Sequence, residues 1–464
     1  MRKLMVSAML LLVAVAPASA RVRAVRKPGG PAATDAYLEA ALQAAAWLES
    51  IERKSGADLG SWPIADSFAV YNPGVDNGAA GVGFFFLRLY DVTGDRHYLD
   101  VAKRAANYVA NEYKGARRMN GHDWLSGASG GGSFLVAVHR ATGDARYLDA
   151  ARGAGDWLLS TAIATAAGLH WQHATVEKTY TGLAHGASGV GIFLLDLYEA
   201  SGDARYLDAA RRAWNWVETY EIPTAHGFVF KRLITDTVSY PGWCGGTTGI
   251  VYFLERLDRV TGEPRYREAL LRAADGLIDT AVPRAGGGVA WDHYGPNSGN
   301  GIVYCHGATS ATSALAAAYR LSGDSRYLEA ARKGAQWVSS RAVAEPRGLS
   351  WYQFDRSPYH ESGLLTGTAS VGHAYLRLWS AERDAAQLES ARQAGEYLLG
   401  LADRPAPGQL RWINYTNPPQ TGSDPLRYES GWYSGAAGIG LFLLELHDAL
   451  HGRAIADVFS GMHP

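Results

Sequence analysis

Cysteine is scarce in this chain, which has two cysteines among 464 residues. This excludes a small scaffold held together by many disulfides. An excess of charge of one sign is also lacking, because 44 Lys and Arg residues are balanced by 45 Asp and Glu residues. Such a balance produces no strong field of the kind that binds nucleic acid or an anionic membrane surface. We therefore expect no nucleic-acid partner.

Long apolar runs are missing beyond the N-terminus. Residues 1–20 have a basic start, an apolar run from Met5 to Ala16 and a small-residue exit at Ala18-Ser19-Ala20. This pattern is typical of a secretory signal peptide. The run is shorter than the roughly 20 residues that cross a bilayer. We expect cleavage after Ala20, a secreted or periplasmic protein, and no membrane span in the mature chain.

The remaining chain divides into two parts. Residues 21–33 are cationic and rich in Pro and Gly, so we expect them to form a flexible leader. Residues 34–464 are expected to form a single domain, because one block recurs along their whole length.

Each block begins at an anchor glycine and continues with an apolar run, usually a (Ser/Thr)-Gly-Asp unit, and a second run with one polar face. The unit predicts a helix end followed by a helix start, because Gly suits a left-handed C-cap and Asp suits an N-cap. Each block is therefore a helical hairpin, with an inner and an outer helix. The anchors are Gly78, Gly127, Gly186, Gly246, Gly307, Gly367 and Gly435.

The two ends of the domain complement each other. The last block has no room for its outer helix, while residues 35–50 supply a matching one. The sequence therefore predicts an all-α fold, a closed (α/α) toroid of seven hairpins with fourteen helices in an inner and an outer ring. The N-terminal helix completes the last hairpin. An open solenoid is the alternative, and it would need capping repeats that the sequence does not show.

The connectors between blocks contain Gly-x-x-Trp or a similar unit. We expect them to form short strand-like segments that cover the end of the barrel where the glycine-rich turns meet. They would then wall a pocket. The units lie at residues 168–171, 227–230, 288–291, 348–351 and 408–412.

Reactive side chains gather just before the anchor glycines, at positions that face one central space in a ring. Cys244 and Cys305 lie two residues before their anchors in neighbouring blocks, and His306 follows Cys305. His185 directly precedes the anchor of the block before them. Two sulfurs and one imidazole suit Zn2+, and three protein ligands leave one position open for catalysis. A Cys244–Cys305 disulfide is the alternative, and it suits an exported protein.

Three strings in this region resemble motifs of a known family. GLAHG (182–186), WCGG (243–246) and YCHG (304–307) resemble the GxxHG, WCxG and CHG motifs of the lanthionine synthetase C-like (LanC-like) proteins. The resemblance extends over residues 35–450. It implies a sevenfold α/α barrel and a zinc enzyme that adds a cysteine thiol to dehydroalanine or dehydrobutyrine in a peptide. Eukaryotic relatives use glutathione, so the expected partners are a peptide or a small thiol.

The resemblance suggests a role for each residue. Cys244, Cys305 and His306 would hold zinc, where an entering thiol loses its proton. His185 would be the general acid that protonates the enolate left after attack; alternatively, it caps the helix that begins at Gly186. Asp123 lies where the family has a catalytic acidic residue; alternatively, it is a solvated loop carboxylate.

Two positions depart from the family pattern. The family usually has an arginine four residues before the first zinc cysteine and an aromatic residue directly after it, and these positions are Tyr240 and Gly245 here. The family arginine is thought to stabilise the enolate oxygen, and Lys231 and Arg232 on the preceding connector are candidates to replace it.

Two other functions stay open. One is a non-catalytic module that binds zinc or a thiol peptide. The other is a carbohydrate-processing enzyme, which would need two carboxylates across the cavity. The candidate carboxylates in the connectors are Asp236, Asp292, Asp355, Glu361 and Asp424.

Overall fold

The computed structural model describes residues 36–66, 68–114, 121–173, 178–294, 298–355, 360–414 and 428–455. The signal peptide expected over residues 1–20, the leader expected over 21–33 and Asp424 lie outside the described residues. The chain divides into Met1–Thr34 and a compact unit, Asp35–Pro464. All the helices and strands belong to the second unit.

The described residues form fourteen helices, as the sequence predicts. They are α1 (Ala36–Ser50), α2 (Ala79–Thr93), α3 (Arg96–Glu112), α4 (Ala128–Thr142), α5 (Ala145–Thr161), α6 (Ala187–Ser201), α7 (Ala204–Glu218), α8 (Thr247–Thr261), α9 (Pro264–Asp279), α10 (Ala308–Ser322), α11 (Ser325–Ser339), α12 (Thr368–Glu382), α13 (Ala385–Leu401) and α14 (Ala436–Leu450).

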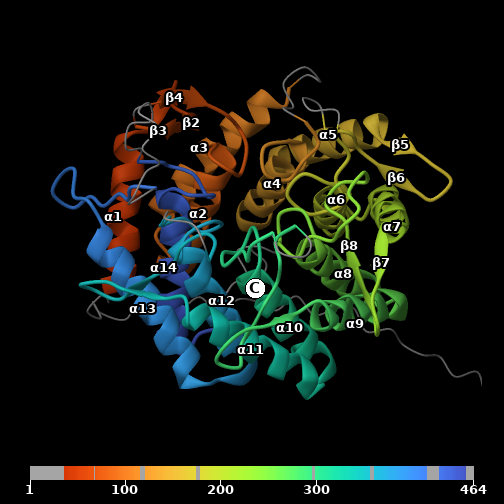
Figure 1. Ribbon diagram of the computed structural model, residues 1–464. Coiled ribbons are helices and arrows are strands. Elements are labelled where there is room, and N and C mark those ends of the chain that lie inside the picture. The colour runs from red at the N-terminus through yellow and green to blue at the C-terminus, as the bar shows by residue number, and fades with distance from the viewer. Residues whose placement is uncertain are drawn as a thin grey trace, which may run out of the picture. The chain divides into compact units, whose positions relative to one another are not determined.

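The helices close into a double ring (Figure 1). The even-numbered helices from α2 to α14 each contact the next one, and α14 contacts α2, so the inner ring is complete. Each odd-numbered helix from α3 to α13 packs on the inner helix that precedes it. Helix α1 packs on α14, although the two helices come from opposite ends of the unit. The predicted closure of the toroid by the N-terminal helix is therefore confirmed.

Phenylalanine side chains fit against glycines between neighbouring inner helices. Because glycine has no side chain, it leaves a hollow on the helix surface that a ring can fill. A methyl group at any of these glycines would collide with the ring of the neighbouring helix. The pairs are Gly83–Phe134, Gly132–Phe193, Gly191–Phe253, Gly372–Phe442 and Gly440–Phe85.

The hairpin turns follow the predicted chemistry. The glycine after each of five inner helices has a φ between 66° and 74°, which is the left-handed C-cap conformation. The aspartate that follows accepts a hydrogen bond from the backbone N–H two residues on in four of these turns. Helix α12 ends instead at Arg383, which has a φ of 59°.

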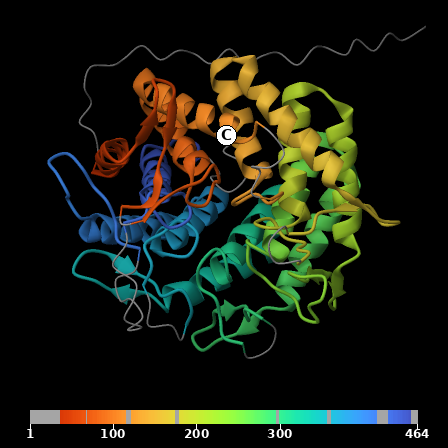
Figure 2. The ribbon, with the colours of Figure 1, turned by 90° about the horizontal axis from the view of Figure 1, so that it is seen from above.

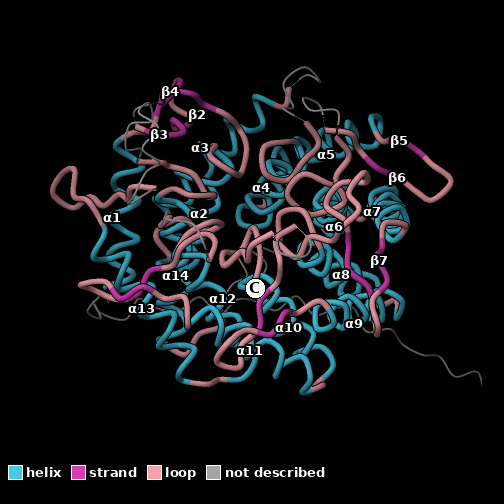
Figure 3. Tube along the Cα trace, viewed as in Figure 1, coloured by secondary structure: helices cyan, strands magenta, loops and turns pink. Residues whose placement is uncertain are grey.

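The connectors contain two-stranded antiparallel sheets (Figure 3). The pairs are β1 (Arg53–Ser55) with β2 (Leu59–Ser61), β3 (Pro63–Ala65) with β4 (Phe68–Tyr71), β5 (Ile163–Ala164) with β6 (Leu169–His170), β7 (Glu221–Pro223) with β8 (Phe228–Phe230), β9 (Val282–Pro283) with β10 (Val289–Ala290), and β11 (Val343–Ala344) with β12 (Leu349–Ser350).

These strands pack against outer helices. Strands β2, β6, β8, β10 and β12 contact α3, α7, α9, α11 and α13 in turn. A buried connector tryptophan anchors most of them, because its indole N–H donates to a backbone carbonyl near the end of the preceding outer helix. The later part of each connector runs toward the next glycine turn. Backbone bridges such as Tyr180↔Leu233 and Gly301↔Phe354 join neighbouring connectors there.

None of the helices in the described part of the chain is long and apolar enough to cross a membrane.

The contacts of the inner glycines lead to a stability prediction. We expect Gly191→Ala to lower the free energy of unfolding by about 1–3 kcal/mol, because the new methyl group overlaps the Phe253 ring. Gly153→Ala is the matched control, since Gly153 is an exposed residue inside α5 with no neighbour near its Cβ position. It should raise the free energy of unfolding by about 0.5–1 kcal/mol through helix propensity. Denaturant titration of both variants measures the difference, and equal effects would contradict the packing described above.

Candidate functional site

Each inner helix begins at its anchor glycine in a tight turn of fixed geometry. The residue after the glycine donates its backbone N–H to the carbonyl seven residues earlier. A side chain on the glycine would collide with the residue six positions earlier, so only glycine fits. The seven bonds join Ala79 to Asn72, Ala128 to Gly121, Ala187 to Tyr180, Thr247 to Tyr240, Ala308 to Gly301, Thr368 to Glu361 and Ala436 to Glu429.

The seven turns are also bonded to one another. The residue two positions before most anchor glycines donates its N–H to the equivalent carbonyl of a neighbouring turn. These bonds run from Asp76 to Leu125, Leu125 to Ala184, Ala184 to Cys244, Cys305 to Leu365, Leu365 to Tyr433 and Tyr433 to Asp76. Between the fourth and fifth turns the bond is shifted by one residue, from Trp243 N–H to the Tyr304 carbonyl. The equivalent positions therefore lie around one ring.

The two cysteines face each other at that shifted step. Their Cα atoms are 5.0 Å apart, and the structure joins the two side chains as a disulfide. This is the state that the sequence analysis left open as the alternative to zinc ligation. A disulfide and a pair of zinc-bound thiolates are two states of the same sulfur atoms, and both states need the sulfurs to meet. The zinc site at Cys244, Cys305 and His306 stays a prediction.

The imidazole of His306 is held in a defined orientation. Its Nδ1 lies 2.7 Å from the Tyr240 hydroxyl, which is also 3.2 Å from the Cys305 carbonyl oxygen. If Tyr240 donates to that carbonyl, Nδ1 carries the proton and Nε2 keeps a lone pair for a ligand. The ring stacks on Phe354 at a centroid distance of 5.1 Å. Tyr240, at the family's arginine position, therefore orients His306.

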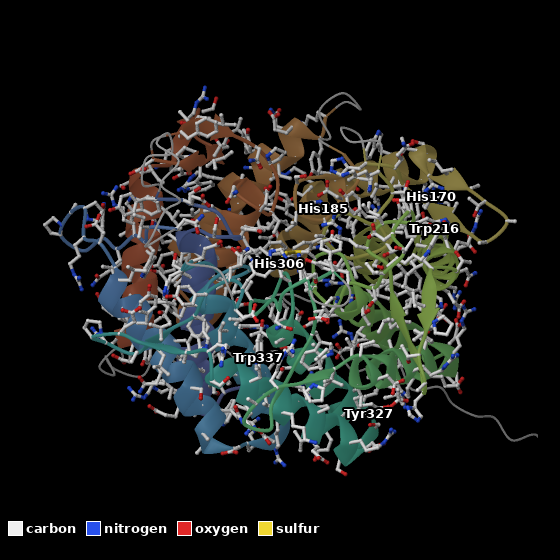
Figure 4. All side chains as sticks on the ribbon, in the orientation of Figure 1. His170, His185, Trp216, His306, Tyr327 and Trp337 are labelled. Atoms are coloured by element: carbon white, nitrogen blue, oxygen red, sulfur yellow. A yellow bond between two sulfur atoms is a disulfide. The ribbon has the colours of Figure 1, made fainter. Side chains whose placement is uncertain are left out.

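Asp123 and His185, the two proposed catalytic residues, lie close to each other. Asp123 is fully buried, so it is not a solvated loop carboxylate. Its Oδ1 accepts the Ser126 N–H at 2.7 Å and lies 3.8 Å from His185 Nδ1. The N-cap residue of α6 is Gly186, and His185 Nδ1 is buried without a hydrogen-bond partner, so this nitrogen does not cap the helix. Figure 4 shows His185 and His306 near the middle of the ring.

A second histidine, His173, approaches the same carboxylate. Its Nε2 lies 3.7 Å from Asp123 Oδ2, and its ring centroid is 5.9 Å from that of His185. The ligand atoms of Asp123, His173 and His185 all lie within 4.8 Å of one another, and among the described residues these three form the one group of His, Cys, Asp and Glu side chains placed so that it could hold a metal ion. This group has one carboxylate and two imidazoles, a donor set that zinc also accepts.

Sequence reasoning missed His173, although a signal was present. His173 stands two residues after the connector tryptophan Trp171, and His293 stands two residues after Trp291. The His293 ring lies 4.8 Å from the His306 ring, just as His173 approaches His185. Aligning the connectors on their tryptophans would therefore have paired each connector histidine with a turn histidine.

Burial keeps several of these histidines neutral. It lowers the pKa of His306 to about 3 and that of His122 to about 4, and it lowers the pKa of His173 and His293 as well. Burial alone would raise the pKa of Asp123, but His185 and the Ser126 N–H outweigh it and lower that pKa. The site therefore combines neutral imidazoles, which are the form that binds metals, with one ionised carboxylate.

Other carboxylates near the turns are protonated more easily. Burial raises the pKa of Asp76 to about 6 and that of Glu361 to about 7. The remaining carbohydrate-site candidates in the described residues contact residues of their own connector or, for Asp355, of the neighbouring connector. Asp236 accepts the Leu233 N–H at 2.9 Å, Asp355 accepts the Asn300 side-chain amide at 2.8 Å, and Asp292 lies 3.5 Å from an Arg284 nitrogen.

Glu361 gives a prediction about pH. Its pKa rises from an ordinary value of 4.5 to about 7, so its favourable contribution to folding is complete below pH 4.5 and is lost as the pH rises through 7. We expect Glu361→Gln, which mimics the protonated acid, to raise the free energy of unfolding at pH 8 by about 1–3 kcal/mol. At pH 4 the variant and the wild type should be equally stable. Thermal or urea unfolding of both proteins between pH 4 and pH 8 tests the sign of this effect. The prediction is wrong if the free energy of unfolding of the variant, relative to that of the wild type, falls as the pH rises from 4 to 8.

Comparison with known proteins identifies related families. Residues 69–151 and 114–392 match the family model of the lanthionine synthetase C-like protein, and the two segments together cover more than half of the chain. The zebrafish (Danio rerio) protein named "Glutathione S-transferase LANCL1" is 26% identical over 161 residues, which are 35% of this chain and 36% of that protein. The match therefore spans about a third of the curated relative.

Solved structures share the fold at low sequence identity. The unsaturated glucuronyl hydrolase of Bacillus sp. GL1, described as degrading glycosaminoglycan, has a TM-score of 0.51 and 16% identity, over 89% of this chain and 96% of that chain. The Lin0763 protein of Listeria innocua has a TM-score of 0.50 and 14% identity, over 91% and 99% of the two chains. At these identities the likeness concerns the helical toroid alone.

Proposed function

Because this chain belongs to the lanthionine synthetase C-like family, we propose that it activates a thiol at zinc and adds it to a dehydroamino acid in a peptide. One observation carries the proposal: two sulfurs from adjacent turns meet at one point, and Tyr240 orients the imidazole of His306, the residue that follows Cys305. The name of the zebrafish relative supports a small thiol as an alternative donor to a peptide cysteine. Export through residues 1–20 is part of the same proposal.

The residues present fit a zinc ion once the disulfide is reduced. Cys244 and Cys305 would supply two thiolates, and His306 would supply Nε2 from a ring that burial keeps neutral. Zinc bound in this way would lower the pKa of an incoming thiol, so that the thiolate forms near neutral pH. The donor set and its support through Tyr240 agree with the way in which other zinc sites orient their histidines.

The proton needed at the end of the reaction would come from His185. The thiolate forms a bond to the β-carbon as the carbon–carbon double bond opens, and the α-carbon of the resulting enolate takes a proton. His185 lies in the turn that precedes the cysteine turns and is partly exposed, so a substrate can reach its ring. Asp123, whose pKa is lowered, is fixed by the Ser126 N–H, and its Oδ1 lies 3.8 Å from His185 Nδ1.

A carbohydrate-processing function has one observation in its favour. Burial, with a smaller contribution from the charge of Asp123, raises the pKa of Asp76, while the pKa of Asp123 is lowered. Two carboxylates with opposite shifts are a pattern of general acid–base pairs. A non-catalytic binding module is favoured by the oxidised state of the cysteines.

Metal content tests the zinc site. We expect the reduced wild-type protein to bind zinc with the two cysteines, and Cys244→Ser to weaken that binding at least tenfold, because a thiolate ligand is lost. His173→Ala is the matched control, since it alters the second donor group and leaves the cysteines intact. Cobalt substitution adds a direct readout, because thiolate ligands produce a charge-transfer band that oxygen and nitrogen ligands lack. Retention of metal by Cys244→Ser with its loss in His173→Ala would place the metal at Asp123, His173 and His185 instead.

Catalysis tests the role of His185. With a dehydroalanine peptide and a thiol, we expect His185→Asn to lower kcat about 100-fold or more while zinc content is unchanged. His170→Asn is a suitable control, because His170 stacks on Trp216 away from the turns (Figure 4). Equal rates for wild type and His185→Asn would remove the general acid and favour a binding module. Hydrolysis of a glycan by Cys244→Ala at the wild-type rate would favour a carbohydrate enzyme.

A further inference from the structure

Arg232 stands among three tyrosine rings next to the cysteine turn. Its guanidinium carbon lies 4.9 Å from the ring centre of Tyr294 and 5.8 Å from those of Tyr180 and Tyr240. Such distances are typical of cation–π contacts. Tyr240 is the residue that orients His306, so Arg232 is one side chain away from the proposed zinc ligand.

The repeat explains why Arg232 reaches this place. Arg232 stands two residues after Phe230, which occupies the position of the connector tryptophans in the other blocks. It is therefore equivalent to His173 and His293, each of which approaches the histidine of the following turn. In the block between them the turn has Gly245 instead of a histidine. A Cβ at residue 245 would collide with Cγ and Cδ of Arg232, so the glycine makes room for the stem of the arginine.

The cation has no anionic partner in the described part of the chain. Arg232 forms no ion pair there, and its Nε is buried without a hydrogen-bond acceptor. The hydroxyls of Tyr180 and Tyr294 likewise make no hydrogen bond to any described residue. Burial raises the pKa of Tyr294, so its hydroxyl stays a proton donor. A guanidinium and two phenol hydroxyls thus offer donors that have no acceptor among the described residues.

We propose that Arg232, Tyr180 and Tyr294 bind a carboxylate of the substrate beside the cysteine turn. Guanidinium groups bind carboxylates through charge-assisted hydrogen bonds, and neighbouring hydroxyls can satisfy the remaining oxygen lone pairs. The carboxylate can belong to the thiol donor or to the peptide acceptor, and the chemistry of recognition is the same. The identity of the ligand as a substrate rests on the proposed function, whereas the anion site itself rests on the geometry.

Binding measurements test this site without requiring catalysis. The thiol donor is represented by 3-(methylthio)propionate and by its uncharged amide. Neither probe contains a thiol, so calorimetric titration of the full chain measures binding without reaction. A short alanine peptide with a free C-terminal carboxylate and the same peptide as an amide represent the acceptor. We expect at least one of the two acids to bind at least tenfold more tightly than its amide in the wild type. The acid that shows the preference identifies the substrate that carries the carboxylate.

Two variants assign the preference to Arg232. Arg232→Gln should abolish the preference for the acid, and Tyr294→Phe should reduce it. Lys231→Gln is the matched control, because it removes the same charge from the adjacent residue, which makes no ring contact or ion pair in the described residues; it should change the Kd less than threefold. Circular dichroism confirms that each variant is folded.

The outcomes are separable from those of the thiol-addition proposal. Binding of neither acid, or equal losses in Arg232→Gln and Lys231→Gln, would overturn the carboxylate site even if the protein adds thiols to peptides. A preference that depends on Arg232 would support the site even if no thioether forms.

Discussion

The glycine turn at the start of each inner helix is the constraint on which the rest of the structure depends. Seven times, a backbone N–H is bonded to the carbonyl seven residues earlier, and a side chain on the anchor glycine would occupy the space that this closure needs. The turns then bond to their neighbours around the ring. As a result, residues distant in sequence stand at equivalent places, and a reactive side chain just before an anchor glycine faces the same region as its counterparts.

Packing between neighbouring inner helices also stabilises the ring. Phenylalanines fit against glycines between neighbouring inner helices, so the helices approach closely and the ring keeps one diameter. In the view turned by 90°, connector loops lie along the lower edge of the picture, outside the ring of helices (Figure 2). A rigid frame of this kind allows the connectors to vary, and the connectors carry His173, Arg232 and His293 toward the turns. The scaffold is repetitive, whereas the site differs from block to block.

The electrostatics of the site follow from burial as much as from partners. Burial lowers the pKa of His306 and raises that of Asp76 and Glu361, while the pKa of Asp123, beside His185, is lowered. The two departures from the family pattern, Tyr240 and Gly245, both shape the surroundings of the cysteine turns. Tyr240 supports His306, and Gly245 makes room for Arg232, so the positive charge stands on the connector rather than in the turn. The proposed zinc site and the proposed carboxylate site both lie by the cysteine turns, where the first would activate a thiol and the second would bind a carboxylate of the substrate.

The amino-acid sequence by itself determined the helices, their number and the closure of the ring. Local signals were sufficient, because apolar periodicity, Ser/Thr-Gly-Asp units and anchor glycines act within one block, and the spare helix at residues 35–50 matched the incomplete last block. The sequence also brought Cys244, Cys305, His306, His185 and Asp123 to attention. Only the tertiary structure decided which distant partners these residues meet, namely Tyr240 for His306 and His173 for Asp123. Those contacts join different connectors and turns across the ring, and no local pattern records the distance between side chains that far apart in the chain.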